Sequence, residues 1–188
     1  MSEELELSVK LKAAINAGDG TEIAKIGAEI DDYIFTCAFV SSSLFDDLIA
    51  MLKSSKFRCL SESIGGIKLF EYNIQFLSDD QKWQLLSVLT ESVSELEDSV
   101  SAFLAVELIA EIWVDNRSLE ALLQLGKATS GRTLALAAHG FDWLAKKTNQ
   151  IDIKEKCLEE LRCLSKNPSN LVRSEAIVAL RRREGTVR

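Results

Sequence analysis

The sequence contains a single proline, Pro168, among its 188 residues. A proline inside a helix costs about 3 kcal/mol, so its scarcity leaves almost the whole chain free to form helices. Although 47% of the residues are hydrophobic, no stretch alternates apolar and polar residues as a half-buried strand does. We therefore expect an all-α protein.

The chain also has only one histidine, His139. General-base and nucleophile relays depend heavily on histidine, which argues against an enzyme of that kind. Gly65 and Gly66 lack the preceding strand and the spacing of a phosphate-binding loop, so we interpret them as a site of close helix packing or a local kink. His139 is expected to be a packed or partly exposed core residue. No catalytic residue and no cofactor are predicted.

The four cysteines, at positions 37, 59, 157 and 163, show no Cys-x-x-Cys spacing. Such isolated cysteines are typical of reduced thiols in a protein core, and they predict no metal site. The acidic start MSEELELS lacks the apolar segment of a secretory signal, and no stretch approaches the ~20 apolar residues that span a membrane. We expect a cytoplasmic protein that does not contact membranes.

The stretch KNPSNLVRSEAIVAL, at 166–180, contains the only proline and indicates two helices joined by a tight turn. Proline is well tolerated in the first helical turn, because its missing N–H has no partner there in any residue. Pro168 is therefore expected to mark a helix start. The apolar residues of the helix that follows share one side: Leu171, Val172, Ala176, Val178, Ala179 and Leu180.

The longer pattern LEELRCLSKNPSNLVRSEAIVAL resembles the HEAT repeat. In that family a leucine-rich helix is followed by a turn with Asn or Asp and Pro, then by Val-Arg and by Ala. The matching residues here are Asn167, Pro168, Val172, Arg173 and Ala176. The resemblance implies a right-handed α-solenoid of about five antiparallel helix pairs, related to HEAT and armadillo repeats.

Looser copies of the repeat are expected, because solenoids need about three or more units. Two further candidate second helices carry Arg58 followed by Ser61 and Arg132 followed by Ala135. The candidate first helices begin near 42, 79, 116 and 151, at intervals of 37, 37 and 35 residues. Their predicted caps are Ser42, Ser78 and Asp115.

The first forty residues predict two more helices, at about 3–16 and 20–39, joined by AGDG. The second carries a continuous apolar stripe of Ile23, Ile26, Ile30, Ile34 and Cys37. We expect residues 1–40 to form an N-terminal capping pair and 42–183 to form four helix pairs. The whole chain, 1–188, is interpreted as one domain.

Charge is unevenly distributed along the chain. Residues 1–145 carry 23 acidic and 11 basic residues, net −12, whereas 146–188 carry net +5. In HEAT-like solenoids the second helix of each pair lines the concave face. The polar residues that we expect at corresponding levels of these helices are Tyr72, Glu107, Glu111, Asp115 and Asp142. They predict either an acidic groove or an ordinary solvated surface.

An acidic groove would attract a basic protein and repel nucleic acid. We therefore expect a non-enzymatic protein-binding module that sequesters a basic partner. In size and charge the chain is similar to immunity proteins that neutralise bacterial toxins, many of them basic nucleases.

Two alternatives stay open, a general scaffold or adaptor and a nucleic-acid enzyme. The chain resembles the HEAT-like alkylpurine DNA glycosylases in placing Trp143 beside Asp142, with Arg173 and the 181–183 arginines nearby in sequence. The acidity of the first three quarters of the chain argues against a duplex-binding groove, which needs positive charge along its length.

Overall fold

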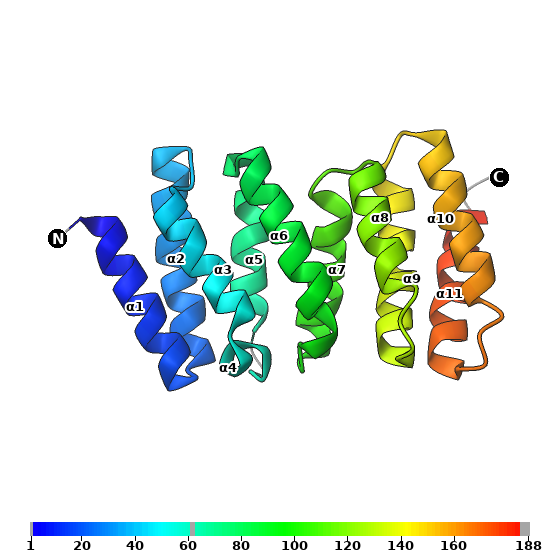
Figure 1. The fold of residues 1–188 in the computed structure, drawn as a ribbon, viewed down its shortest axis with the longest axis horizontal. Helices are drawn as coiled ribbons and strands as arrows, with labels where there is room; N and C mark the ends of the chain where they lie inside the picture. The colour runs from blue at the N-terminus through cyan, green and yellow to red at the C-terminus, as the bar shows by residue number, and fades with distance from the viewer. Residues whose placement is uncertain (1, 61–62, 185–188) are drawn as a thin grey trace. The chain divides into compact units, whose positions relative to one another are not determined.

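The computed structural model describes residues 2–60 and 63–184, and these residues form helices and connecting turns without any strand (Figure 1). The all-α prediction is confirmed. The α-helices are α1 (Glu3–Ala17), α2 (Gly20–Cys37), α3 (Ser42–Lys53), α4 (Ser55–Arg58), α5 (Ile64–Asn73), α6 (Asp79–Ser92), α7 (Ser99–Glu111), α8 (Asn116–Leu125), α9 (Gly131–Lys147), α10 (Ile151–Leu164) and α11 (Asn170–Glu184). Short 3-10 helices, η1 (Ile74–Phe76) and η2 (Val93–Glu95), follow α5 and α6.

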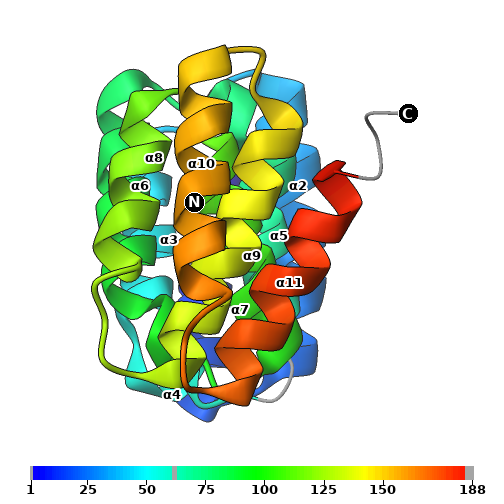
Figure 2. The same cartoon turned by 90° about the vertical axis from the view of Figure 1, so that its right-hand side faces the viewer.

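The chain divides into two compact units, Met1–Leu104 and Ala105–Arg188. In the first unit α1, α3 and α6 contact one another in succession, α2 packs on α1, and α5 packs on α2. In the second unit α9 contacts α8, α10 and α11, and Figure 2 shows α8 beside α10 and α9 beside α11. Each unit is thus built from two layers of helices, with its apolar core between them.

The helix starts agree closely with the periodicity of the sequence. The first helices of the predicted pairs begin at Ser42, Asp79, Asn116 and Ile151. Ser78 caps α6 in a reciprocal capping box with Gln81, and Asp115 caps α8. The cap of α3 is Ser41 and not Ser42, because the Ser41 hydroxyl accepts the free N–H of Leu44 at 3.1 Å.

The first two helices form as the AGDG turn predicts. Gly18 ends α1 in the left-handed region, at φ 70°, and the Asp19 carboxylate accepts the N–H of Glu22 to cap α2. The four isoleucines of the predicted stripe on α2 are buried. Cys37 is only half-buried, because α2 ends there and Ala38 turns the chain away with φ 56°.

The predicted single helix around Arg58 is wrong. Instead, α4 ends at Arg58 and α5 begins at Ile64, while Ser61 lies outside the described residues. The Arg58 carbonyl accepts the N–H of Glu97 at 2.9 Å, and its guanidinium pairs with Glu95. These bonds tie Arg58 to the segment after α6, so the Arg58–Ser61 repeat register does not hold.

Close packing explains the paired glycines in α5. A Cβ at Gly66 would lie 2.6 Å from the buried ring of Phe57, and one at Gly65 would lie 2.9 Å from the Cβ of Ala24 on α2. Both distances are below any real contact, so only glycine lets α5 approach so closely. The interpretation of these residues as a packing site is confirmed.

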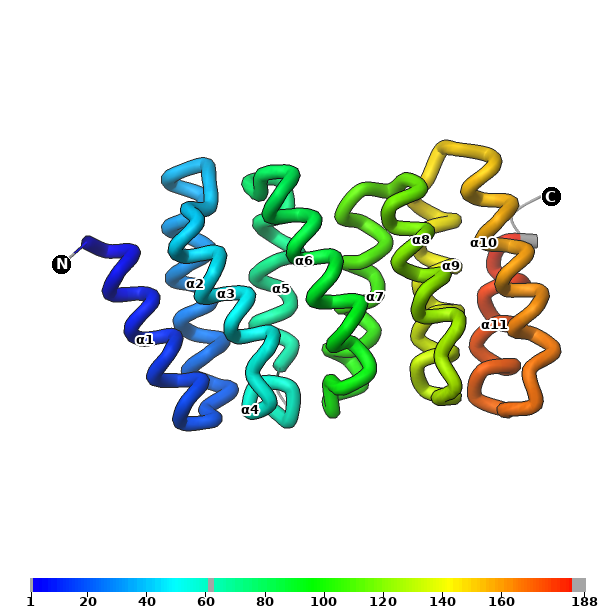
Figure 3. Tube along the Cα trace, viewed as in Figure 1, coloured from blue at the N-terminus to red at the C-terminus, as the bar shows by residue number. Residues whose placement is uncertain are grey.

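The predicted tight turn around Pro168 is present: α10 ends at Leu164 and α11 begins at Asn170 (Figure 3). Pro168 itself lies in the turn, two residues before the helix starts. The Arg173 guanidinium holds this turn by donating to the carbonyls of Asn167, at 2.9 Å, and Pro168, at 3.3 Å. Of the predicted apolar face, Val172, Ala176 and Ala179 are buried, whereas Leu171 and Val178 are exposed. The buried face is therefore narrower than the sequence indicates, because only positions at spacings of three and four face α9 and α10.

Ala176 is fully buried where α11 packs on α9 and α10. We expect Ala176→Leu to lower the free energy of unfolding by about 1 to 3 kcal/mol, since the added atoms overpack the core. The matched control is Val178→Leu on the exposed side of the same helix, which should change stability by less than about 0.5 kcal/mol. Urea denaturation measures both, and equal stabilities of the two variants would refute this helix register.

Candidate functional site

Two of the predicted groove residues, Glu107 and Glu111, lie on the part of α7 that belongs to the second unit. The Nε2 atom of His139, on α9, lies 2.8 Å from Glu107 Oε1, and its Nδ1 atom lies 3.3 Å from Glu175 Oε1 on α11. An imidazolium donates from both nitrogens, whereas a neutral ring donates from one. His139 thus links α9 to α7 and α11 through two carboxylates. Its side chain is partly exposed, as predicted, and its contacts are polar.

Glu111 likewise has its polar partners on α9. Its Oε1 atom accepts the indole N–H of Trp143 at 2.6 Å and lies 2.7 Å from Lys147 Nζ, both on α9. The Trp143 ring stacks on His139 with centroids 6.3 Å apart, and Lys146 Nζ lies 4.4 Å from the same ring. Glu107 and Glu111 therefore link α7 to α9, and both carboxylates already have partners on α9.

Asp142 does not line an acidic groove. It is only 4% exposed, and its carboxylate is bound by Arg183 Nε at 2.5 Å and Arg182 Nη1 at 3.3 Å. A buried carboxylate needs such partners, because an unpaired charge in the core is very costly. Asp142 and these two arginines consequently hold the end of α11 against α9.

Asp115 does not continue the line of Glu107 and Glu111. Helix α7 ends at Glu111, Val114 has a left-handed φ of 53°, and the Asp115 carboxylate caps α8. Hydrogen bonds from the Arg117 side chain, with an ion pair of 2.5 Å, hold the pKa of Asp115 below its usual value. This residue stabilises a helix start.

The negative charge of the protein is concentrated in the first unit. Residues 1–104 carry 18 acidic and 8 basic residues, net −10, whereas 105–188 carry 11 acidic and 14 basic residues, net +3. The predicted asymmetry therefore follows the division into units. An acidic binding surface is better sought on the first unit than at Glu107, Glu111, Asp115 and Asp142.

Tyr72 is the predicted site residue that lies in this first unit. Its side chain is 53% exposed on α5, and it lines a shallow cavity of about 200 Å³ between α2 and α5 together with Asp31 and Lys68. The floor of this cavity is formed by small residues, which include Gly27 and Gly65. Tyr72 thus adds an exposed aromatic ring to the surface of the first unit.

Three phenylalanines continue this surface. Phe35 and Phe39 follow one another at helical spacing and are 74% and 54% exposed, and the Phe35 ring meets Phe76 edge to face with centroids 6.4 Å apart. Phe76 comes four residues after Tyr72. We call Phe35, Phe39, Tyr72 and Phe76 the aromatic surface. Exposed aromatic clusters of this kind are typical of protein-binding sites.

A cavity of about 460 Å³ opens beside this surface. Phe39, Phe45 and Phe76 form its apolar walls, and Asp46 and Asp80 lie among its polar lining residues. Phe45 is buried, so the cavity reaches from the exposed rings down to the core. We call it the Phe39 pocket. The sequence did not predict it, because its lining residues come from the turn after α2, from α3, from η1 and from α6 with the turn before it.

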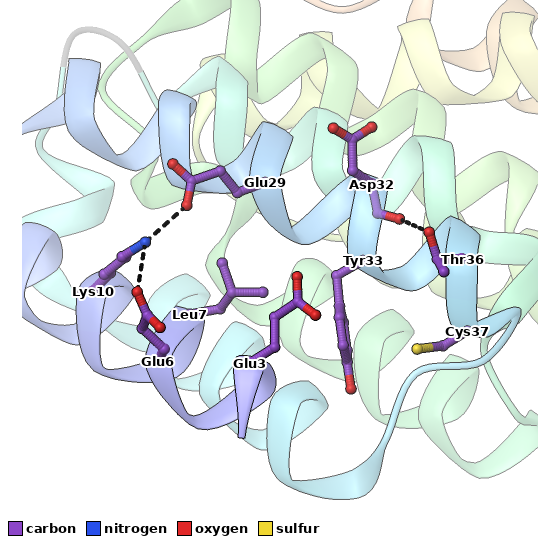
Figure 4. Close-up of a pocket in the computed structure, with 9 residues that line it drawn as sticks. All are labelled: Glu3, Glu6, Leu7, Lys10, Glu29, Asp32, Tyr33, Thr36 and Cys37. Atoms are coloured by element: carbon purple, nitrogen blue, oxygen red, sulfur yellow. Dashed lines mark hydrogen bonds and ion pairs between the residues drawn. The ribbon is translucent and has the colours of Figure 1, made fainter. Parts of the chain in front are cut away.

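A further pocket, of about 400 Å³, lies between α1 and α2 (Figure 4). Lys10 is paired with two of its carboxylates: Lys10 Nζ lies 3.1 Å from Glu29 and 3.2 Å from Glu6, which raises the pKa of Lys10. The neighbouring Cys37 thiol, together with burial and Glu4, raises the pKa of Tyr33 to about 12. Tyr33 therefore stays a hydrogen-bond donor at neutral pH, and the pocket offers no activated nucleophile or base.

The described residues contain no cluster of histidine, cysteine and carboxylate side chains arranged to hold a metal ion. All four cysteines are free; Cys157 is buried, and burial raises its pKa to about 12. Cys59 and Cys163 are exposed, so the expectation of four core thiols is wrong for these two. Within the described residues, no helix has the length and apolarity needed to cross a bilayer.

The exposed phenylalanines are the functional candidates that sequence reasoning missed. A signal was present, because Phe35 and Phe39 are four residues apart and fall off the buried stripe of Ile30 and Ile34 on α2. Apolar residues on the solvent side of an amphipathic helix indicate a surface to be covered.

We expect His139→Ala to lower the free energy of unfolding by about 1 to 2 kcal/mol, because Glu107 and Glu175 lose their shared donor. Adding Glu107→Gln to this variant removes one uncompensated carboxylate and should restore part of the loss. Thermal and urea unfolding of the single and double variants measure the coupling. Unchanged stability of His139→Ala would contradict the bridging role.

The charge of Asp115 is expected to stabilise the protein by up to about 1 kcal/mol, since the pair with Arg117 is partly solvated. Asp115→Asn keeps a capping side chain and removes only the charge. Because the folded-state pKa is lowered, this stabilisation is complete above the unfolded-state pKa of about 3.9 and is lost as the pH falls through the folded value. The difference in the free energy of unfolding between Asp115→Asn and wild type should therefore shrink below about pH 4. Urea titrations at several pH values measure it. A difference that grows towards acid pH would contradict the argument.

The comparisons with known proteins supply no relative. No protein-family model, no curated protein and no solved structure matches the chain. What the protein does therefore has to be inferred from its own charges, surfaces and pockets.

Proposed function

We propose that this chain is a non-enzymatic protein-binding module whose first unit binds a basic protein. The observation that carries the proposal is the coincidence, in one unit, of a net charge of −10 with the aromatic surface, of which Phe35, Phe39 and Tyr72 are exposed. Uncompensated negative charge accelerates the encounter with a basic partner. Aromatic rings supply the apolar contact area that keeps such a partner bound.

The fold that we propose for this role is a right-handed, HEAT-like α-solenoid. Helix starts at regular intervals and two helical layers within each unit support this topology. The turn at Asn167–Asn170, held by Arg173, and the buried Ala176 fit the repeat that the sequence resembles. A solenoid exposes the surfaces of successive helices, and it therefore suits the binding of another protein.

Within this class, the partner that we favour is a basic toxin domain such as a nuclease, which the chain would neutralise as an immunity protein. Charge complementarity supports this choice, because nucleases carry positive surfaces for phosphate backbones. A scaffold or adaptor role would use the same surface with a different basic protein, and identification of the partner separates the two.

The glycosylase alternative has less support. Asp142 is buried between Arg182 and Arg183, and the indole N–H of Trp143 is bound to Glu111. The carboxylate and the tryptophan on which the resemblance to the glycosylases depends are therefore both bound to other side chains of the protein. The pairing of the arginines with Asp142 also weakens the positive charge that a duplex would contact.

The function is tested with the full chain as bait in affinity capture from the native host, followed by mass spectrometry and titration of the purified partner. We expect a basic protein whose affinity falls as salt rises, and no shift of duplex DNA at moderate salt. Asp32→Lys, on the exposed side of α2, should slow association by about two-fold or more at low salt.

The matched control is Glu120→Lys, because Glu120 is equally exposed but lies in the second unit. It should leave the association rate nearly unchanged. Equal effects of the two reversals would contradict binding through the first unit. DNA binding that depends on Arg173 and Arg181, without a protein partner, would favour the nucleic-acid enzyme instead.

A further inference from the structure

The Phe39 pocket combines apolar walls with two exposed carboxylates, Asp46 and Asp80. In the parts of the chain that the structure describes, neither Asp46 nor Asp80 has an ion-pair or side-chain hydrogen-bond partner, and both side chains are exposed. This contrasts with Glu107, Glu111 and Asp142, whose carboxylates contact the side chains of His139, Lys147 and Arg183, respectively.

The pocket is also held in place by its own polar groups. The Gln81 amide donates to the Val40 carbonyl at 3.0 Å, and its oxygen accepts the N–H of Ser78 at 2.9 Å. These bonds join the turn after α2 to the start of α6. Phe76 is supported from outside by the edge of Phe35, so the walls are formed before any ligand arrives.

We propose that the Phe39 pocket receives an arginine side chain of the basic partner. This inference rests on the proposed function and names the chemistry that the first unit recognises. A guanidinium stacks on aromatic faces and is weakly hydrated, so it enters a partly apolar site more readily than an ammonium does. Its planar fork then reaches the carboxylates of Asp46 or Asp80 at the mouth. The volume of about 460 Å³ leaves room for the side chain and its flanking backbone.

Asp80 is well placed for this contact. It lies in the first turn of α6, where the free N–H groups of the helix favour negative charge. Its neighbour Asp79 shares the same helix turn and the same exposure but does not line the pocket. The two residues therefore form a natural pair of test and control positions.

The first test needs no identified partner. The full chain, labelled with ¹⁵N, is titrated with a capped pentapeptide that carries one central arginine between alanines, and with matched peptides that carry citrulline or lysine. We expect saturable shifts of the amides of Phe45, Gln81 and Gln84 with arginine, weaker shifts with lysine and none with citrulline. Shifts that are absent with arginine, or equal with citrulline, overturn the proposal.

Variants locate the site. Asp80→Asn should weaken binding of the arginine peptide about five-fold, and Phe39→Ala by a similar factor, whereas Asp79→Asn should change it less than about two-fold. Phe39 is half exposed, so its variant is expected to fold, and circular dichroism checks this. If Asp79→Asn and Asp80→Asn weaken binding equally, the effect is one of general charge and the pocket proposal is wrong.

The same variants separate the pocket from the proposed function. If the basic partner binds with the expected salt dependence but Asp80→Asn and Phe39→Ala leave its affinity unchanged, the pocket proposal fails and the binding module stands. A second copy of this chain is the competing occupant, since Arg181 is exposed on α11. Analytical ultracentrifugation tests this. If it shows an oligomer that either Arg181→Ala or Asp80→Asn abolishes, the pocket binds a second copy of the chain, and the proposal of an arginine from the basic partner is wrong.

Discussion

The rest of the structure depends on one constraint: every helix must bury its apolar stripe against the neighbouring helices of the two layers. No helix here can shield its own stripe, so each is held by the helices beside it. Small residues allow close approach, as at Gly66 against Phe57 and at the buried Ala176 on α11. These contacts set the spacing of the helices and hence the position of every polar residue between them.

The same packing decides which charges remain available. In the second unit the helices α7, α9 and α11 bring Glu107, Glu111 and Asp142 against histidine, lysine, tryptophan and arginine donors. Charges that are removed from water need such partners, and these carboxylates therefore serve stability. In the first unit the basic residues are too few to do the same, since they number 8 against 18 acidic residues. The excess negative charge is left for solvent or for a partner.

Exposed aromatic rings beside this charge give the first unit a two-part surface. Phe35 lies on the side of α2 that its isoleucines leave free, Phe39 follows in the turn after α2, and Phe76 on η1 meets the Phe35 ring. In the proposed binding role, apolar rings would hold a partner at short range, whereas carboxylates such as Asp46 and Asp80 would act at longer range and select its sign of charge. Neither feature requires catalysis, which agrees with the engagement of the single histidine in a structural bridge.

The sequence by itself determined the helical class, the helix starts near 42, 79, 116 and 151, and the burial of residues such as Ile30 and Ala176. These properties depend on local periodicity and capping, which act over a few residues. Only the tertiary structure decided that Asp142 is buried between arginines 40 and 41 residues away. It also decided that Phe39 and Phe76 enclose one pocket. Such outcomes depend on which helices meet, and no local pattern encodes contacts between residues so far apart in the chain. The end of α4 at Arg58, which is bonded to Glu97, is of the same kind.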